Sequence, residues 1–259
     1  IALHKTLDAL GADDRKRVAS RLAAWIASET ARVLGPLVAV TQAARDPARP
    51  AALRGLCAPL AEAGGVVARA AVEPALAALD RPMRRVASTL GIKLGTLDVY
   101  LPLLLKPEAM RWRLALAAAH ENGVMPALPP PGAAALATPP DTERFEAWAR
   151  AGFRALGAQM LRVDMAERLA RIAHEGRGAG KRAAFAPDPA LATSLGLRPP
   201  SFAQLMLALG FRPAEALAAD ASAHPHWVWR GARRPAPVAR PPRRGNAFAA
   251  LAALRPGDA

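Results

Sequence analysis

Residues Leu90–Arg113 read LGIKLGTLDVYLPLLLKPEAMRWR, and they restrict the backbone at several points. Gly91 and Gly95 bracket a piece too short for anything but an extended segment or a tight turn. Pro102 interrupts the apolar run that follows, so this run forms neither a regular central strand nor an uninterrupted helix. Pro107 stands where the first position of a new helix is expected, because proline has no N–H to leave unpaired there. The window therefore predicts a turn, a broken apolar segment and a helix in succession.

This window resembles the C-terminal region of the alphaproteobacterial superfamily-two helicases related to the RNA helicase of the mitochondrial degradosome. That family carries a glycine-bounded segment leading into a YLPxLLKP block, which Tyr100–Pro107 (YLPLLLKP) matches. Four later stretches resemble the same family in the same order: MPALPPP (125–131), GFRALGAQMLRVD (152–164), FAPDPALATSLGL (185–197) and FAALAAL (248–254). The resemblance implies a helical domain that lies across the two RecA-like lobes of the motor and forms one wall of the channel for the departing single strand.

The likeness covers most of the chain but only the back part of such a helicase, so we expect the motor upstream of Ile1. The chain has no G-x-x-x-x-G-K-[ST] loop: GRGAGK at 176–181 has the wrong spacing and precedes Arg182. It also has no acidic quartet of the DEAD type. We therefore expect no ATP hydrolysis, no catalytic residues, no metal site and no cofactor in this fragment, since ATP and Mg²⁺ would bind the missing motor.

Composition predicts an all-α fold made mostly of short helices. Of the 259 residues 52% are apolar, mainly Ala and Leu, and only 5% are aromatic, which favours helices over sheets, while 25 prolines limit helix length. Cys57 is the sole cysteine, so a disulfide framework or a thiolate zinc site is excluded, and a reducing cytosol is the expected compartment. No apolar run reaches the roughly 18 residues of a membrane-spanning helix, so no membrane partner is expected.

Apolar periodicity and breaker residues divide the chain into four parts. We expect a helical accessory domain at 1–122, a proline-rich connector at 123–140, a smaller helical domain at 141–218 and an Arg/Pro-rich disordered tail at 219–259. The expected helices of the first domain are 13–34, 36–44, 51–63, 73–90 and 107–122. In the smaller domain we expect helices at 142–151 and 164–175, with a short strand around Gln159–Arg162.

Residues 189–212 have helix-turn-helix proportions, with short helices expected at 189–195 and 200–209. One interpretation directs Arg198, Ser201 and Gln204 towards nucleic acid. The other is a plain helical hairpin, and we prefer it because the second helix carries almost no basic or amide side chains on its outer face.

The net charge of +14, from 35 Lys and Arg against 21 Asp and Glu, predicts attraction to polyanions. The tail is the most basic part for its length, and its two tryptophans beside a series of arginines could stack on unpaired bases or dock on the domain. The sequence leaves these two alternatives open. The candidate nucleic-acid-binding residues are Lys93, Lys106, Arg111, Arg113, Trp227, Trp229, Arg230, Arg233, Arg234, Arg240, Arg243 and Arg244.

Together these patterns predict a non-catalytic C-terminal accessory region of an ATP-dependent RNA or DNA helicase, which contacts single-stranded nucleic acid beside the upstream lobes. The alternative is a protein-interaction scaffold that recruits a nuclease or another partner and has no direct nucleic-acid role. In that case the charge serves solubility alone.

Overall fold

The computed structural model describes residues 5–121, 123–177, 183–214 and 225–231. Helices dominate these residues, as expected, but three small antiparallel sheets join them, so the all-α prediction is correct only in part. Apart from the strand around Gln159–Arg162, we did not predict these strands, because they are two to four residues long and too short to show an alternating pattern.

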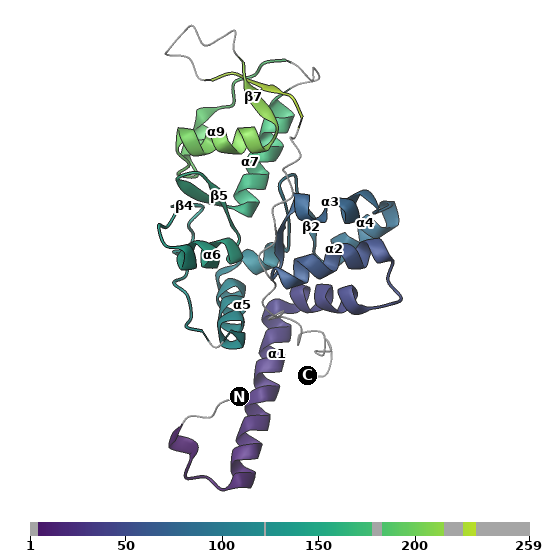
Figure 1. Ribbon diagram of the computed structural model, residues 1–259, viewed down its shortest axis with the longest axis vertical. Helices are drawn as coiled ribbons and strands as arrows, with labels where there is room; N and C mark the ends of the chain where they lie inside the picture. Colours follow the sequence, from purple (N-terminus) through teal and green to yellow (C-terminus); the bar gives the residue numbers. More distant parts are fainter. Residues whose placement is uncertain (1–4, 122, 178–182, 215–224, 232–259) are drawn as a thin grey trace.

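The chain begins with a single turn at Lys5–Leu7 and then the long helix α1 (Ala12–Arg45). We predicted two helices separated at Gly35-Pro36, and α1 does consist of two helical segments that meet there, because Leu34 leaves the helical conformation (φ −109°, ψ 23°). Pro36 removes one i→i−4 hydrogen bond at this point, which allows the kink between the two segments. The N-terminal part of α1 extends away from the rest of the molecule (Figure 1).

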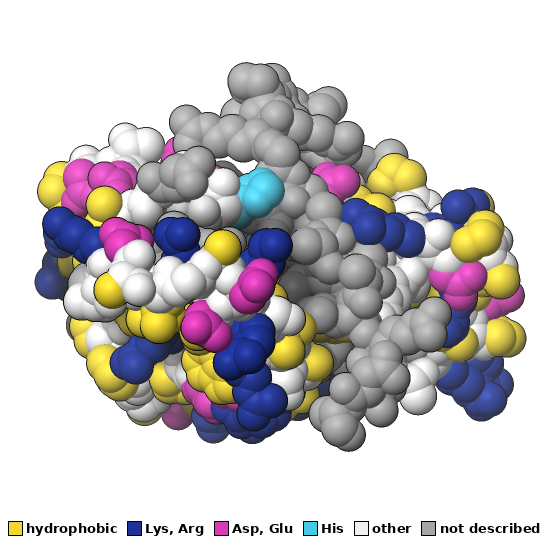
Figure 2. All heavy atoms as spheres, turned by 90° about the horizontal axis from the view of Figure 1, so that it is seen from below, with side chains coloured by type: hydrophobic (Ala, Val, Ile, Leu, Met, Phe, Trp, Pro, Cys, Tyr) yellow, Lys and Arg dark blue, Asp and Glu magenta, His cyan; other side chains and the backbone are white. Residues whose placement is uncertain are grey.

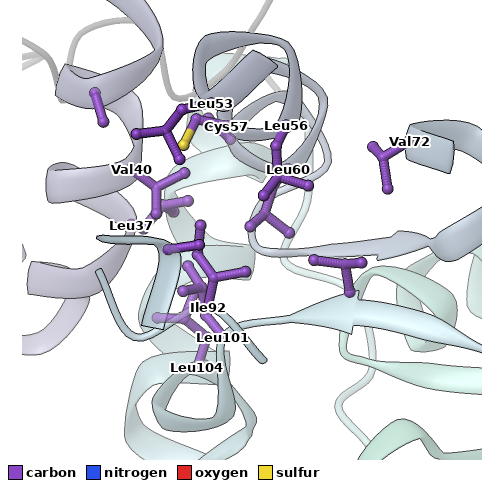
Figure 3. Packing of buried hydrophobic residues seen from close by; sticks show 14 of the residues in the cluster. Leu37, Val40, Leu53, Leu56, Cys57, Leu60, Val72, Ile92, Leu101 and Leu104 are labelled. Atoms are coloured by element: carbon purple, nitrogen blue, oxygen red, sulfur yellow. The ribbon is translucent and has the colours of Figure 1, made fainter. Parts of the chain in front are cut away.

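The first core forms where the C-terminal part of α1 packs against α2 (Ala51–Glu62). Its fully buried side chains come from both helices and from the later strand region, as Figure 3 shows for Leu37, Leu56, Ile92 and Leu101. The predicted helix at 73–90 is instead two helices, α3 (Arg69–Ala77) and α4 (Arg81–Thr89). The Asp80 side chain accepts a hydrogen bond from the Met83 N–H and begins the second of them.

Residues 90–113 contain the predicted turn, broken apolar segment and helix, and the turn belongs to a β-hairpin that we did not predict. β2 (Lys93–Leu94) and β1 (Val66–Ala68) flank β3 (Asp98–Tyr100) in an antiparallel sheet. The broken apolar segment is a 3-10 turn, η2 (Pro102–Leu105), and α5 (Pro107–His120) starts at the expected proline.

The second sheet has the order β4-β6-β5, formed by β4 (Ala135–Ala137), β5 (Phe153–Leu156) and β6 (Gln159–Arg162). The strand expected around Gln159–Arg162 is therefore confirmed, whereas β4 lies inside the stretch that we expected to be only a connector. α6 (Thr142–Arg150) precedes β5, and its Phe145 and Trp148 pack on the hydrophobic cluster that contains the α5 residues Met110 and Leu114.

The C-terminal part contains α7 (Val163–Gly176), α8 (Pro189–Thr193) and α9 (Pro199–Ala208), followed by β7 (Phe211–Pro213) and β8 (Trp227–Trp229). The predicted disorder of 219–247 is wrong at β8, which pairs with β7 on one side and bridges to Phe185 on the other. Apolar indoles provide the buried surface that the surrounding Pro and Arg residues lack.

One plan repeats three times along the chain. In each sheet the last strand lies in the middle, with the hairpin's other strand on one side and an earlier strand, or the single residue Phe185, on the other. In each case a glycine with positive φ follows directly on a helix and leads into the hairpin: Gly91 (79°), Gly152 (99°) and Gly210 (88°). We call residues 51–100 the first unit, 107–162 the second unit and 163–229 the third unit.

Candidate nucleic-acid interface

Three of the predicted contact residues lie on the surface. Lys93 is on the edge strand β2, Lys106 precedes α5, and Arg111 lies on the second turn of that helix, all with exposed side chains. The described residues provide none of the three with an ion pair or a side-chain hydrogen bond. Their charges are therefore available to an external anion, but no described contact brings the three side chains together.

Arg113 cannot contact a nucleic-acid strand, which corrects our prediction. Its side chain is 2% exposed, and its Nη1 donates a hydrogen bond to the Gly64 carbonyl oxygen. Burial lowers the pKa of this guanidinium to about 10. The spacing of Arg113 from Met110 and Ala117 on the apolar face of α5 is the signal that could have shown this.

Both tryptophans of the predicted tail pack on the C-terminal core, Trp227 within it and Trp229 against it. Trp227 is 2% exposed, so it cannot stack on an external base. Trp229 is half-buried, with its ring edge-on to His174 at 6.2 Å between centroids and with the Arg177 guanidinium 4.4 Å from its centroid. The docking alternative is therefore the correct one for both indoles.

Arg230 is the single predicted tail arginine that the structure describes. Its side chain is exposed, and its backbone N–H donates to the Gly210 carbonyl oxygen at 2.9 Å. The remaining predicted arginines lie outside the described residues: Arg233, Arg234, Arg240, Arg243 and Arg244.

The predictions missed a group of arginines on α4. This helix begins RPMRR at residues 81–85, and Arg81 and Arg85 are exposed one turn apart. Within the described residues neither of their guanidinium groups has an ion pair or a hydrogen bond, and the hydrogen bond from the Thr89 hydroxyl goes to the backbone carbonyl oxygen of Arg85. From Arg81 to Lys93 the sequence contains four basic residues and no acidic one. We did not identify this face because we predicted a single amphipathic helix at 73–90. In the structure α4 is a separate helix that begins after Asp80, so its faces do not continue those of α3.

Arg84 has a different role from its neighbours. Its Nε donates to the Leu79 carbonyl oxygen at 3.2 Å, and its Nη2 donates to that of Leu76 at 3.0 Å. The Leu76 oxygen belongs to the last turn of α3, where helix carbonyl groups lack intrahelical partners, and Leu79 lies in the turn that follows. Arg84 therefore fixes α4 against α3 and leaves the outward face to Arg81 and Arg85.

The loop of the first hairpin is held by the later part of the chain. The Glu167 carboxylate on α7 accepts hydrogen bonds from the backbone N–H groups of Thr96, Leu97 and Asp98 at 2.6, 2.6 and 3.0 Å. A Cβ at Gly95 would lie 2.4 Å from the carboxyl carbon of this Glu167, so glycine is required for the close approach.

A buried ion pair completes this junction. The Arg154 guanidinium on β5 donates two hydrogen bonds to the Asp98 carboxylate, both 2.8 Å long, and a third to the Leu97 carbonyl oxygen. The Asp98 side chain is 6% exposed, so the pair is shielded from solvent. The hairpin loop is consequently fixed, and α4 and β2 remain as the free surface of the first unit.

On the face of the molecule that Figure 2 draws, the described cations do not merge into one region. Figure 2 shows Lys and Arg side chains in several separate groups, with apolar and acidic side chains between them. Beside Arg111, a shallow apolar hollow of about 470 Å³ is lined by α5 and by Gly123, Met125 and Leu128. Contact with a polyanion would thus be local to particular elements.

The described residues contain no group of three His, Cys, Asp or Glu side chains that could hold a metal ion. Within the same residues no helix is both long and apolar enough to cross a membrane. The Cys57 thiol is buried in the first core, and burial raises its pKa to about 11, which suppresses its nucleophilic form at neutral pH.

Comparison with known proteins gives no relative for this chain: no family model, no curated protein and no solved structure matches it.

Proposed function

We propose that this chain is a nucleic-acid-binding accessory region of an ATP-dependent helicase and that it contacts single-stranded RNA or DNA without catalysing a reaction. The observation that carries the proposal is the acid-free basic surface of α4 and β2, where Arg81, Arg85 and Lys93 are exposed and unpaired within the described structure. Phosphates are the anions that such side chains bind with the release of counterions. The motor lobes, their ATP and a nuclease partner are part of the proposal because residues 90–113 resemble the helicase family.

The experiment measures the affinity of the full chain for a fluorescently labelled 12-nucleotide single strand by anisotropy, from 50 to 200 mM salt. We expect weak binding with little sequence preference. Replacing Lys93, Lys106 and Arg111 by Gln should make the slope of log K against log salt shallower by about 0.7 for each residue that contacts a phosphate.

The matched control removes three exposed arginines that lie elsewhere, in the variant Arg15→Gln/Arg45→Gln/Arg168→Gln. This variant loses the same charge, so a general electrostatic effect would change both variants equally. Equal slopes in the two triple variants would contradict a contact at Lys93, Lys106 and Arg111.

A scaffold function is the second candidate, and α1 provides its specific support. Trp25 and Leu22 on α1 are 55% and 38% exposed, and the Trp25 ring also lies edge-on to Trp112 of α5 at 5.9 Å between centroids. Large apolar side chains at such positions are typical of contact sites for another protein. Failure of the whole chain to bind any single strand at 50 mM salt would favour this candidate.

A further inference from the structure

We propose that α4 is the recognition helix of a winged helix-turn-helix unit and that it binds the major groove of duplex DNA through Arg81 and Arg85. This inference rests on the proposed nucleic-acid function and adds duplex DNA as a second ligand beside the single strand. It concerns the first unit and none of the tail residues.

The order of elements in the first unit supports this assignment. α3 and α4 are joined by a short turn at 78–80, which gives a helix-turn-helix. β1 lies before these helices and pairs with β3, while the β2–β3 hairpin follows them. A helix-turn-helix bracketed by one strand and a hairpin is the topology of winged DNA-binding domains, in which the second helix enters the groove.

The two faces of α4 have opposite chemistry. Met83, Val86 and Leu90 share one face and pack against the first core. Arg81 and Arg85 are on the opposite face at a spacing of four residues, so both side chains extend from the same side of the helix. Arginine is the residue that most often reads guanine in the major groove and also binds phosphate.

The other two units lack this surface. α6 carries Glu143 and Glu146, and its arginines are paired, Arg144 with Asp141 and Arg150 with Glu121. α9, which has the same place in the third unit as α4 in the first, has no charged residue and contacts β5. Within the described residues the first unit is therefore the one equipped for a polyanionic groove.

Groove dimensions favour DNA over RNA as the duplex. The major groove of B-form DNA is about 12 Å wide and admits an α-helix. The major groove of A-form RNA is deep and too narrow for side chains to read. A helix that binds through its outer face should therefore distinguish the two duplexes.

The test uses the full chain and three labelled ligands of one sequence: a 20-base-pair DNA duplex, its single DNA strand and the RNA duplex. We expect the DNA duplex to bind several-fold more tightly than either of the others at 100 mM salt. Arg81→Gln/Arg85→Gln should lower duplex-DNA affinity about 10- to 100-fold, since a good arginine contact to a base edge contributes roughly one order of magnitude. Its salt slope should also fall by up to about 1.8.

Arg45→Gln/Arg168→Gln is the control, because it removes from other helices two exposed arginines that have no ion pair with any residue the structure describes. Arg81→Lys/Arg85→Lys is a second control that keeps the charge and should retain most of the salt slope while losing base preference. Thermal unfolding of each variant should match the parent, because the substituted side chains are exposed.

Three results would overturn the inference: equal affinity for duplex and single-stranded DNA, RNA duplex binding as tight as DNA, or duplex affinity unchanged by Arg81→Gln/Arg85→Gln. In each of these cases the single-strand arm still reports on the proposed function. Absence of binding to all three ligands at 50 mM salt would instead remove the proposed function itself.

Discussion

The first and third units have the same topology but opposite surfaces. In both, a glycine after the second helix donates its N–H to a carbonyl oxygen three residues earlier, Gly91 to Ser88 at 3.0 Å and Gly210 to Leu207 at 3.1 Å. The residue after each glycine is buried, Ile92 in one unit and Phe211 in the other. Yet α4 faces solvent with arginines, whereas α9 is uncharged and packs on β5.

The residues that form a unit therefore differ from the residues that decide what the unit can bind. The turn glycine and the buried residue after it specify the helix–hairpin junction, since both act through local backbone geometry and burial. The outer face of the second helix is free to vary because it contributes little to the core. A shared topology therefore gives a shared fold and no shared ligand.

The largest expected difference concerns the basic residue two positions after each turn glycine. Arg154→Met should lower the free energy of unfolding by about 3–5 kcal/mol, because it leaves the buried Asp98 carboxylate without its partner. Arg212→Met, at the equivalent position of the third unit, should cost only about 1 kcal/mol, because the described hydrogen bonds of the Arg212 side chain go to the nearby Leu207 and Phe211 carbonyl oxygens. Urea unfolding of both variants measures the two losses in free energy of unfolding. Equal losses would show that the Arg154–Asp98 pair stabilises the fold no more than a local contact does.

The turn glycines should tolerate a methyl group unequally. Gly152→Ala should cost about 2–4 kcal/mol, because φ is 99° and the new Cβ would lie 2.4 Å from Cδ2 of the buried Leu105. Gly91→Ala has φ 79° but free space, with Pro36 Cβ at 3.8 Å, and should cost about 1–2 kcal/mol. Thermal denaturation ranks the two, and a larger loss for Gly91→Ala would mean that contacts at this turn differ from those described.

In the first unit, stability should decline in alkali through Cys57. Burial raises the pKa of this thiol to about 11, from an ordinary value of 9.0. The thiol of the unfolded chain ionises first, so stability is complete below about pH 9 and is lost as the pH rises towards 11. The loss amounts to at most about 2–3 kcal/mol.

The Cys57→Ala variant tests this expectation, because it removes the ionisable group and adds a packing loss that does not vary with pH. The difference in unfolding free energy between parent and variant should shrink from pH 8 to pH 11. A constant difference would show that the thiol is not protected by burial.

In the third unit the smallest effect should appear in acid. Burial, and then the charge of Arg177, lower the pKa of His174 from its ordinary value of 6.5. The neutral form is favoured in the folded chain, so stability is complete above pH 6.5 and is lost as the pH falls through the folded pKa. The free energy of unfolding of His174→Gln should fall less than that of the parent as the pH decreases from 8 to 5. An equal fall in the two proteins would show that other groups cause the loss of stability in acid.

Local signals predicted the elements that depend on few residues. Pro107 begins α5, and Gly91 ends the helix before β2, because the missing N–H and the positive φ are properties of single residues. The short strands other than that at Gln159–Arg162 were not predicted, nor was the break between α3 and α4. Their hydrogen bonds join segments far apart in the sequence, as in the pairing of Val66 with Tyr100.

The candidate site was predicted less well than the fold. Lys93, Lys106 and Arg111 are exposed as the charge pattern suggested, but Arg113 and Trp227 are buried. Charge and aromatic character identify residues that could bind nucleic acid. They do not report which way a side chain points once helices and strands have packed.

The sequence by itself determined the helical majority, the positions of the proline and glycine boundaries and the excess of positive charge, since each follows from residue type and local spacing. Only the tertiary structure decided which cations remain free. The Asp98 and Glu167 carboxylates hold the first hairpin loop against the later part of the chain, Arg84 closes the end of α3, and the outward face of α4 is left to Arg81 and Arg85. These contacts join residues up to 71 positions apart, so packing, and not local preference, selects them.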